Sequence, residues 1–366
     1  MDTFIHGLEL SEAFYREAAR PIIDRLFPGL RYSAALIGPG SEVLGFDTPI
    51  SSDHHWGPRF WMFLHVDDYA DMKEKVSQAF RENLPYTFRG YSVNFGPPDQ
   101  AHVRLMEYKE TGLVEHMIEI ETTSSFLSWY LGWDGKRELT VEDWLLFSEH
   151  RLLTFSSGKV FYDGLRELEP LRKTLGYYPR DVWLYLMAVD WEKIGQEEPF
   201  VGRTGDVGDD LGSRVIAARL TQYLMHLCFL MERRYAPYSK WLGTAFARLD
   251  CAPYMLPLLR GILTADGWEE REQYLGRACE VAVGILNELH VMPSLPARVS
   301  PFYSRPYKVI HSDEISAAIR RVIPDERLRH MYPPIGSVNQ FIDSVKILTT
   351  PPLCQGLKGL FQLDQD

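Results

Sequence analysis

LIGPGSEVLGFDTPISSDHHWGPRFWMFL, residues 36–64, reads as an apolar strand, a glycine-rich turn, a polar connection and a second apolar strand. Ile37 and its apolar neighbours predict a short buried strand, which Gly38-Pro39-Gly40 ends by bending the chain sharply. A glycine turn lets backbone approach a ligand closely, and one helical turn over 42–46 would direct its first N–H groups, with the Ser41 hydroxyl, at an anion. We therefore predict that Gly40 and Ser41 bind phosphate.

The polar connection carries the second candidate group. Asp53 follows Ser41 by 12 residues, and Asp53-His54-His55-Trp56 leads into the strand predicted for 60–64. Residues two apart on an extended chain project from the same side, so Asp53 and His55 would point the same way. A carboxylate and an imidazole in this arrangement are candidate ligands for a divalent cation.

These residues carry a resemblance to a known fold. A Gly-Ser turn followed about a dozen residues later by Ser-Asp-x-Asp at the head of a strand is typical of the nucleotidyltransferase fold of DNA polymerase beta and the aminoglycoside adenylyltransferases. Ser52-Asp53-His54-His55 is similar to that pattern, and His55 stands where it has its second aspartate. The resemblance implies an α+β fold with a mixed sheet, flanking helices and a mainly helical domain after it.

The chain more closely resembles an uncharacterised bacterial family, a domain of unknown function described only as nucleotidyltransferase-like. The resemblance spans nearly the whole chain and is carried by Gly-Ser-Glu-Val-Leu-Gly-Phe-Asp (40–47), Asp-His-x-Trp-Gly-Pro-Arg (53–59) and Tyr-Ala-Pro-Tyr-Ser-Lys-Trp-Leu-Gly (235–243). It supplies no known substrate. The candidate nucleotide-binding residues of the whole chain are Gly40, Ser41, Arg59 and Lys240.

Residues 114–122, VEHMIEIET, alternate apolar and polar side chains and predict a strand with Glu119 and Glu121 on one side. In the resembled fold a third carboxylate arrives from a neighbouring strand. The resemblance therefore implies Glu119 and Glu121 as catalytic candidates beside Asp53, with Glu119 favoured. The alternative is a half-exposed strand whose acidic face is simply solvated.

Nucleotidyl transfer needs carboxylates that hold divalent cations, a donor-rich turn for the leaving phosphates and a base near the acceptor hydroxyl. Asp53, Glu119 and the Gly40-Ser41 turn suit these roles, and the predicted metal ligands are Asp53, His55 and Glu119. Magnesium prefers oxygen ligands, whereas imidazole suits manganese and softer cations. His55 therefore either shifts the preferred cofactor from Mg to Mn or abolishes two-metal catalysis.

Two functions remain open at this point. The first is a metal-dependent nucleotidyltransferase that moves a nucleoside monophosphate from a nucleoside triphosphate, such as ATP, to a hydroxyl of a small molecule or protein. The second is a degenerate relative that binds a nucleotide or a partner without turnover. Convergence of Asp53 and Glu119 on one metal would favour the first, and a solvent-facing Glu119 would favour the second.

The organisation of the chain changes near residue 180. Residues 9–27 place apolar side chains at steps of four and predict an amphipathic helix before the first strand, 67–83 predict a second helix, and 151–162 predict a strand, a turn and a strand. After Tyr178-Pro179 long helical patterns take over. We expect a nucleotidyltransferase-like domain over 1–180 and a helical bundle over 181–366, with a cleft between them.

Two stretches of the helical half are candidates for further roles. Residues 202–212 interleave four glycines with three acids and one arginine, which predicts either a loop that orders over substrate or a plain helix cap and connection. Residues 233–241 gather three cations and three aromatics, which suits either stacking of a base or domain packing. Lys240 is the nucleotide-binding candidate in this stretch.

Composition excludes several classes of protein. The 366 residues are 45% hydrophobic and 24% charged, which is enough for a full core. A formal net charge of -11 argues against nucleic acid as a partner. The four cysteines form no Cys-x-x-Cys pair, and we find neither an export signal nor a run of about 18 apolar residues. We expect a cytoplasmic protein without a membrane partner.

Overall fold

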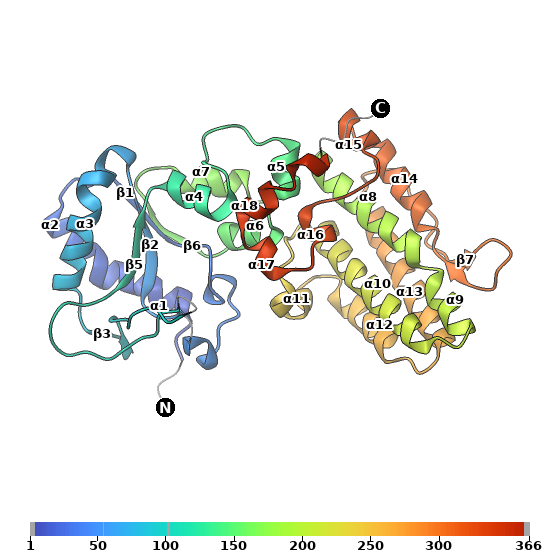
Figure 1. Cartoon of the computed structure of the whole chain (residues 1–366), viewed down its shortest axis with the longest axis horizontal. Helices are drawn as coiled ribbons and strands as arrows, with labels where there is room; N and C mark the ends of the chain where they lie inside the picture. Colours follow the sequence, from blue (N-terminus) through green and yellow to red (C-terminus); the bar gives the residue numbers. More distant parts are fainter. Residues whose placement is uncertain (1–3, 54, 101–102, 362–366) are drawn as a thin grey trace. The chain divides into compact units, whose positions relative to one another are not determined.

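The computed structural model describes residues 4–53, 55–100 and 103–361. The chain divides into two compact units, residues 1–138 with 151–176 and residues 139–150 with 177–366 (Figure 1). The expected division at residue 180 assigns 139–150 to the first domain, whereas its contacts assign it to the second. The reason is that α5 (Val141–Leu146) packs against α8 (Arg180–Glu197).

The first unit is built on a mixed sheet in the order β5-β2-β1-β6. Strand β1 is antiparallel to both β2 and β6, whereas β2 is parallel to β5. The strands of this unit, including a separate short hairpin of β3 and β4, are β1 (Tyr32–Leu36), β2 (Arg59–Leu64), β3 (Thr87–Phe88), β4 (Tyr91–Ser92), β5 (Met117–Glu121) and β6 (Lys159–Asp163). The helices and turns are α1 (Gly7–Phe14), the π-helical turn η1 (Tyr15–Ala19), α2 (Arg20–Leu26), the 3-10 turns η2 (Glu42–Leu44) and η3 (Pro49–Asp53), α3 (Val66–Asn83), α4 (Thr123–Leu131) and α7 (Leu168–Thr174). Helix α6 (Glu149–Ser156) begins in the residues assigned to the second unit and continues into those of the first.

Helices cover both faces of this sheet. On one face Phe14 and Tyr15 of the first helix and Phe80 of α3 bury the strand residues Phe60 and Ile118. On the other face α4 lies against β2, with the Phe126 ring 4.8 Å from Trp61 and 5.5 Å from Phe63 between centroids. Alternation along β2 therefore serves two cores, because consecutive strand residues point to opposite faces.

The helix predicted for 9–27 is present as α1, η1 and α2, and the π-helical turn changes which side chains face inward. Leu10, Phe14 and Ile22 are buried as expected, but from the turn onward Tyr15, Ala19 and Ile23 are buried as well, and Leu26 is 42% exposed. A π-helical turn inserts an extra residue, which rotates the buried face by one position. The helix predicted for 67–83 is confirmed by α3.

The strand-turn-strand prediction for 151–162 is wrong in its first half. Residues up to Ser156 form α6, Gly158 turns the chain with φ of 67°, and only Lys159–Asp163 is a strand. A short apolar run such as Leu152 to Phe155 does not distinguish strand from helix by pattern alone. Both Leu152 and Phe155 are fully buried as helix residues.

The second unit is mainly helical and is organised around α8. That helix is buried nearly all round, with Trp183, Tyr185 and Trp191 among its buried side chains, and it packs against α10 and α14. The further elements are α9 (Phe200–Asp206), α10 (Asp210–Met231), α11 (Ser239–Phe246), α12 (Ala252–Thr264), α13 (Trp268–Glu288), β7 (Ser300–Pro301), β8 (Lys308–Val309), α14 (Ser312–Arg321), α15 (Glu326–His330), α16 (Val338–Phe341), α17 (Val345–Leu348), α18 (Pro351–Gln355) and the 3-10 turn η4 (Lys358–Phe361).

The fold class is α+β, a mixed sheet with flanking helices followed by a mainly helical region, as the sequence predicted. No helix in the described ranges combines the length and the apolar character needed to cross a membrane.

Candidate functional site

The predicted phosphate turn follows the end of β1, beside the start of β2, at one end of the two central strands of the sheet. The two strands are antiparallel with Ala35 opposite Trp61, so the end of β1 lies beside the start of β2. Gly38 and Gly40 have φ of 84° and 141°, conformations that side-chain-bearing residues rarely adopt. The sequence pattern therefore identified a real sharp turn.

A buried ion pair occupies this turn. Glu42 and Arg59 are 3% and 7% exposed, and Arg59 Nε donates to Glu42 Oε1 at 2.9 Å. Arg59 Nη2 donates to the Pro39 carbonyl at 2.6 Å, and a Cβ on Gly40 would lie only 2.4 Å from that nitrogen. Gly40 is therefore needed to let the guanidinium pass. The charge of Arg59, a predicted nucleotide-binding residue, is neutralised by Glu42 rather than left open to an anion.

A second contact joins the same two sequence motifs. Buried Asp47 accepts hydrogen bonds from the Trp56 indole Nε1 at 3.0 Å and from the Gly7 backbone at 2.7 Å, and His6 Nδ1 lies 3.0 Å from it. Asp47 thus ties the start of α1 to the connection between β1 and β2. Four residues of the recognised motifs, Glu42, Asp47, Trp56 and Arg59, have structural partners that account for them.

Ser41, Asp53 and His55 are the motif residues that these contacts do not account for. Ser41 precedes η2, is half-buried, and its hydroxyl caps no backbone group of that turn in the described structure. His55 has φ of 44° and its backbone N–H donates to the Arg104 carbonyl at 3.3 Å. Asp53 is the last residue of η3, and its side chain lies outside the described part of the chain, as does His54. The predicted Asp53, His55 and Glu119 ligand set is therefore untested.

The two acids of β5 differ in their surroundings. Met117 is the β5 residue opposite Arg59, so Glu119, opposite Trp61, lies about 6.6 Å further along the strand from the turn. Glu119 is exposed. Glu121 is half-buried and accepts hydrogen bonds from the Tyr69 hydroxyl at 3.0 Å and from Lys73 Nζ at 3.1 Å. Glu121 is thus hydrogen-bonded to side chains of α3, whereas Glu119 is the acid of β5 that is exposed to solvent.

Among the residues that the structure describes, no three His, Cys, Asp or Glu side chains gather closely enough to hold a metal ion. The Asp53 side chain is not among those described.

The aromatic side chains of 233–241 pack within the second unit. Tyr235 is buried with its ring 5.0 Å from Tyr177, and the Arg233 guanidinium lies 4.7 Å over the Trp183 ring. Of the two interpretations of this stretch, the structure agrees with packing of the aromatic side chains. Lys240 is exposed and its Nζ lies 5.0 Å over the Trp241 ring.

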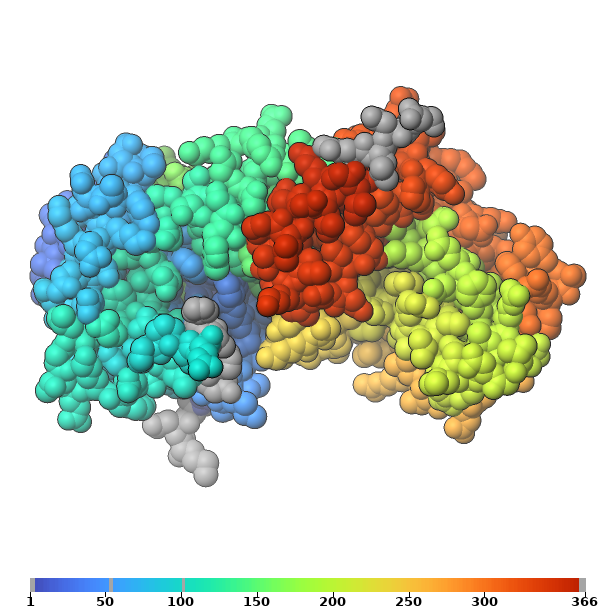
Figure 2. All heavy atoms as spheres, viewed as in Figure 1, coloured from blue at the N-terminus to red at the C-terminus, as the bar shows by residue number. Residues whose placement is uncertain are grey.

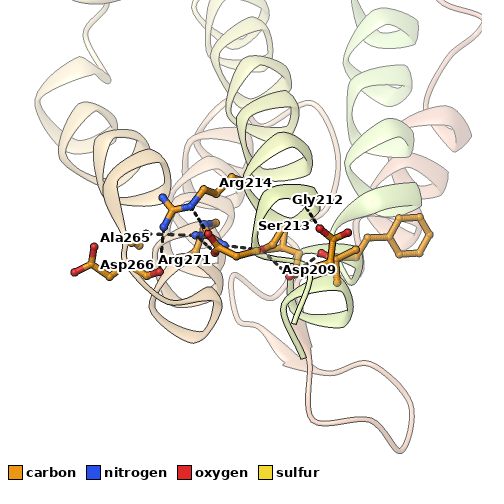
Figure 3. Close-up of polar contacts among 11 residues, drawn as sticks. Asp209, Gly212, Ser213, Arg214, Ala265, Asp266 and Arg271 are labelled. Atoms are coloured by element: carbon orange, nitrogen blue, oxygen red, sulfur yellow. Dashed lines mark hydrogen bonds and ion pairs between the residues drawn. The ribbon is translucent and has the colours of Figure 1, made fainter. Parts of the chain in front are cut away.

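Residues 202–212 form helices and a cap rather than a free loop. Asp209 caps α10 by accepting from the Gly212 backbone at 2.8 Å, as Figure 3 shows. Gly205 lies in α9, where a Cβ would be 2.3 Å from Trp268 Cβ, so this glycine permits close packing. Of the two interpretations of this stretch, the structure agrees with the cap and connection.

A polar network next to this cap ties α10 to α13 and to the connection that precedes α13 (Figure 3). Fully buried Arg271 of α13 donates to the Ser213 hydroxyl at 2.6 Å and to Asp210 Oδ1 at 3.0 Å, both on α10. Arg214 donates to the other oxygen of Asp210 at 2.7 Å and to the Asp266 carbonyl at 3.1 Å. The charged groups of Asp210, Arg214 and Arg271 therefore have a structural role.

A hollow that the sequence did not predict lies within the second unit. Its volume is about 170 Å³, and it is lined by residues of α8 and α10 and by residues 339–343. Figure 2 shows the residues after 338, in red, against the yellow-green helices of the same unit. A smaller hollow of about 60 Å³ shares His226, Asn339 and Asp343 with it and reaches Glu149.

Burial shifts the titration of the groups that line these hollows. It raises the pKa of Asp190 to about 6 and that of Glu149 to about 8, and it lowers the pKa of His226 to about 4. Perturbed groups that line a cavity are typical of functional sites, although structural networks perturb pKa values too. The one sequence signal was an aspartate inside an apolar run, Ala188-Val189-Asp190-Trp191.

The chain has a partial match to a family model and a distant similarity to a solved structure. Residues 144–242 match a family model described as "Domain of unknown function (DUF4037)", and this range includes Glu149, Asp190 and His226. No curated protein matches the chain. A crystal structure of a nucleotidyltransferase-like protein from Exiguobacterium sibiricum 255-15 is similar at 13% identity and a TM-score of 0.33, over 86% of this chain and 89% of that one. Similarity at this level does not support an argument about function.

Proposed function

We propose that the protein is a metal-dependent nucleotidyltransferase that moves a nucleoside monophosphate from a nucleoside triphosphate to a hydroxyl of a small molecule or protein. The observation that carries the proposal is the sheet topology. Strand β2 has antiparallel β1 on one side and parallel β5 on the other. The end of β1 and the starts of β2 and β5 therefore lie at the same end of the sheet. The Gly-Ser turn follows β1, and the Asp53 segment precedes β2.

The proposed roles follow from the chemistry of each side chain. Asp53 supplies the charged metal ligand, and the exposed Glu119 supplies a second carboxylate. His55 either supplies a nitrogen ligand or positions a water molecule. Ser41, whose hydroxyl caps no backbone group of η2 in the described structure, and the turn backbone contact the phosphates. A divalent cation bound by these ligands would polarise the α-phosphate and neutralise the leaving phosphates. Arg59 acts as a positioning residue, because Glu42 holds its guanidinium.

A specific observation favours a second candidate, a relative of this fold that binds a nucleotide or partner without turnover. The Glu42–Arg59 pair lies in the turn, which places a carboxylate where the leaving phosphates would sit. Glu119 also lies two residues into β5, away from the turn, and faces solvent. Both features weaken phosphate and metal binding at this edge.

The experiment that separates the two is a transfer assay combined with metal titration. The protein is incubated with labelled nucleoside triphosphates, Mn²⁺ or Mg²⁺ and a cell extract, and incorporation of label is followed. We expect labelling that is stronger with Mn²⁺, because His55 replaces an oxygen ligand by a nitrogen. His55→Asp should move the preference toward Mg²⁺, and Asp53→Asn should abolish labelling.

Calorimetric titration of both metals into the same proteins tests the site itself. Asp71→Asn, which neutralises an exposed aspartate of α3, is the matched control and should bind metal as the unaltered protein does. Equal metal affinity in the unaltered protein, His55→Asp and Asp53→Asn would mean that this stretch is not a metal site. Binding without turnover would then be the better proposal.

A further inference from the structure

The hollow of about 170 Å³ in the helical unit combines a buried acid and a base on the same helix. Asp190 and Lys193 of α8 are three residues apart, which places them one above the other on the helix surface, roughly 5–6 Å apart between Cβ atoms. Tyr223 and His226 of α10 also line the hollow. All of these residues belong to one compact unit.

Asp190 has an unused hydrogen-bond acceptor. The residue is 1% exposed, and its Oδ2 has no hydrogen-bond partner among the described residues. A buried polar atom without a partner costs about 1–3 kcal/mol, and more when it carries charge. Such a carboxylate oxygen on a cavity wall is satisfied by a donor that enters the cavity, either water or the donor of a ligand.

Lys193 supplies the opposite charge. Its ammonium group donates to the Gln340 carbonyl and lies 5.2 Å over the Tyr223 ring. An ammonium group has three N–H donors, so one hydrogen bond to a carbonyl leaves donors for a ligand. The other cation of the lining, Arg219, already pairs with Glu197 at 2.7 Å.

We propose that this hollow binds a small zwitterion of amino-acid size, with its ammonium on Asp190 and its carboxylate on Lys193. A simple cation would be repelled by Lys193 and a simple anion by Asp190, whereas a molecule with both charges satisfies both side chains. The volume is well below the roughly 300–1,000 Å³ of sites for drug-sized ligands, which excludes a nucleoside triphosphate. The site is independent of nucleotidyl transfer in the first unit.

The first test is isothermal titration calorimetry of the full chain with each of the proteinogenic amino acids. We expect at least one to bind, and its affinity to fall at least tenfold in two matched compounds, the decarboxylated amine and the acid that lacks the amino group. No binding by any amino acid at millimolar concentration would overturn the proposal and leave a water-filled hollow. Equal binding of the amine would overturn it in favour of a simple cation site.

The second test uses variants and reads both binding and stability. Asp190→Asn and Lys193→Met should each weaken binding at least tenfold, whereas Glu288→Gln, which neutralises an exposed acid of α13 outside the hollow, should not. Asp190→Asn should leave the melting temperature of the unliganded protein unchanged or raise it, because an isosteric amide removes a buried charge. Unchanged binding with lowered stability would show that Asp190 is structural, and the proposal would fail.

Discussion

The Glu42 carboxylate and the Arg59 guanidinium lie almost wholly out of solvent, so each charge depends on the other. Both belong to the sequence motifs at 40–47 and 53–59, and their contacts are with each other and with Pro39. A single residue type in a motif therefore does not reveal its role. Arginine suits a phosphate and a buried carboxylate equally well, because its planar donor fork matches both.

We predict that breaking this pair destabilises the first unit. Glu42→Ala leaves a buried guanidinium without its counter-charge, and we expect the free energy of unfolding to fall by roughly 3–5 kcal/mol, as for other broken buried pairs. The double variant Glu42→Leu with Arg59→Met should recover most of that loss. Urea denaturation of the single and double variants measures both values. A double variant that is as unstable as the single one would contradict the argument.

The buried side chain of His116 is a second residue from whose surroundings we derive a prediction. Its Nδ1 accepts from the Ile118 backbone at 3.1 Å, its Nε2 lies 3.3 Å from the Ser77 carbonyl, and burial lowers the pKa of the imidazole from 6.5 to about 4. The neutral ring fits these partners, because a protonated Nδ1 cannot accept.

Stability of the first unit should therefore depend on pH through this residue. The unfolded chain takes up the proton near pH 6.5 and the folded chain only near pH 4, so the contribution is complete above pH 6.5 and is lost as the pH falls toward 4. His116→Asn, whose side-chain oxygen can still accept from Ile118, should flatten the decline across this window. Denaturation midpoints from pH 8 to pH 4 test this, and identical slopes for both proteins would refute it.

At the scale of elements, local pattern identified the helices well but not their ends or their buried faces. The π-helical turn of residues 15–19 rotated the first helix by one position, and residues 202–212, rich in glycine, became helices. Helix propensity is a weak prior that packing overrides. Gly205 is an example, because it lies in a helix where a larger side chain would clash with Trp268.

The cap of α10 gives a prediction at this scale. Asp209 satisfies the backbone N–H of Gly212 in the first turn of the helix, so Asp209→Ala should lower the free energy of unfolding by about 1 kcal/mol. Asp209→Ser, which keeps a capping oxygen, should restore most of the loss. Thermal unfolding of the three proteins measures the effect. Equal losses in both variants would mean that charge rather than capping is responsible.

For the whole molecule, the net charge of -11 makes a prediction about partners. Binding of a polyanion gains free energy chiefly by releasing counterions from phosphates neutralised by lysine and arginine, and this chain has an excess of acids. We expect weak retention of single-stranded and transfer RNA at physiological salt. Filter binding at several salt concentrations checks this, and micromolar or tighter binding with a steep salt dependence would disprove it.

The sequence by itself determined the sharp turn at Gly38 to Gly40, the helix over 67–83 and the change to helices in the second half. These features are local, because glycine geometry and the period of apolar residues act over a few positions along the chain. The structure agrees with all of them.

Only the tertiary structure decided which side chains meet. It paired Glu42 with Arg59 and Asp47 with Trp56, joined Glu121 to Lys73, and moved residues 139–150 into the second unit. It also brought Asp190 and Lys193 of one helix against Tyr223 and His226 of another to form the hollow. The physical reason is that an ion pair or a cavity depends on residues far apart in the chain, and no local period of the sequence records which distant side chain will face a buried charge.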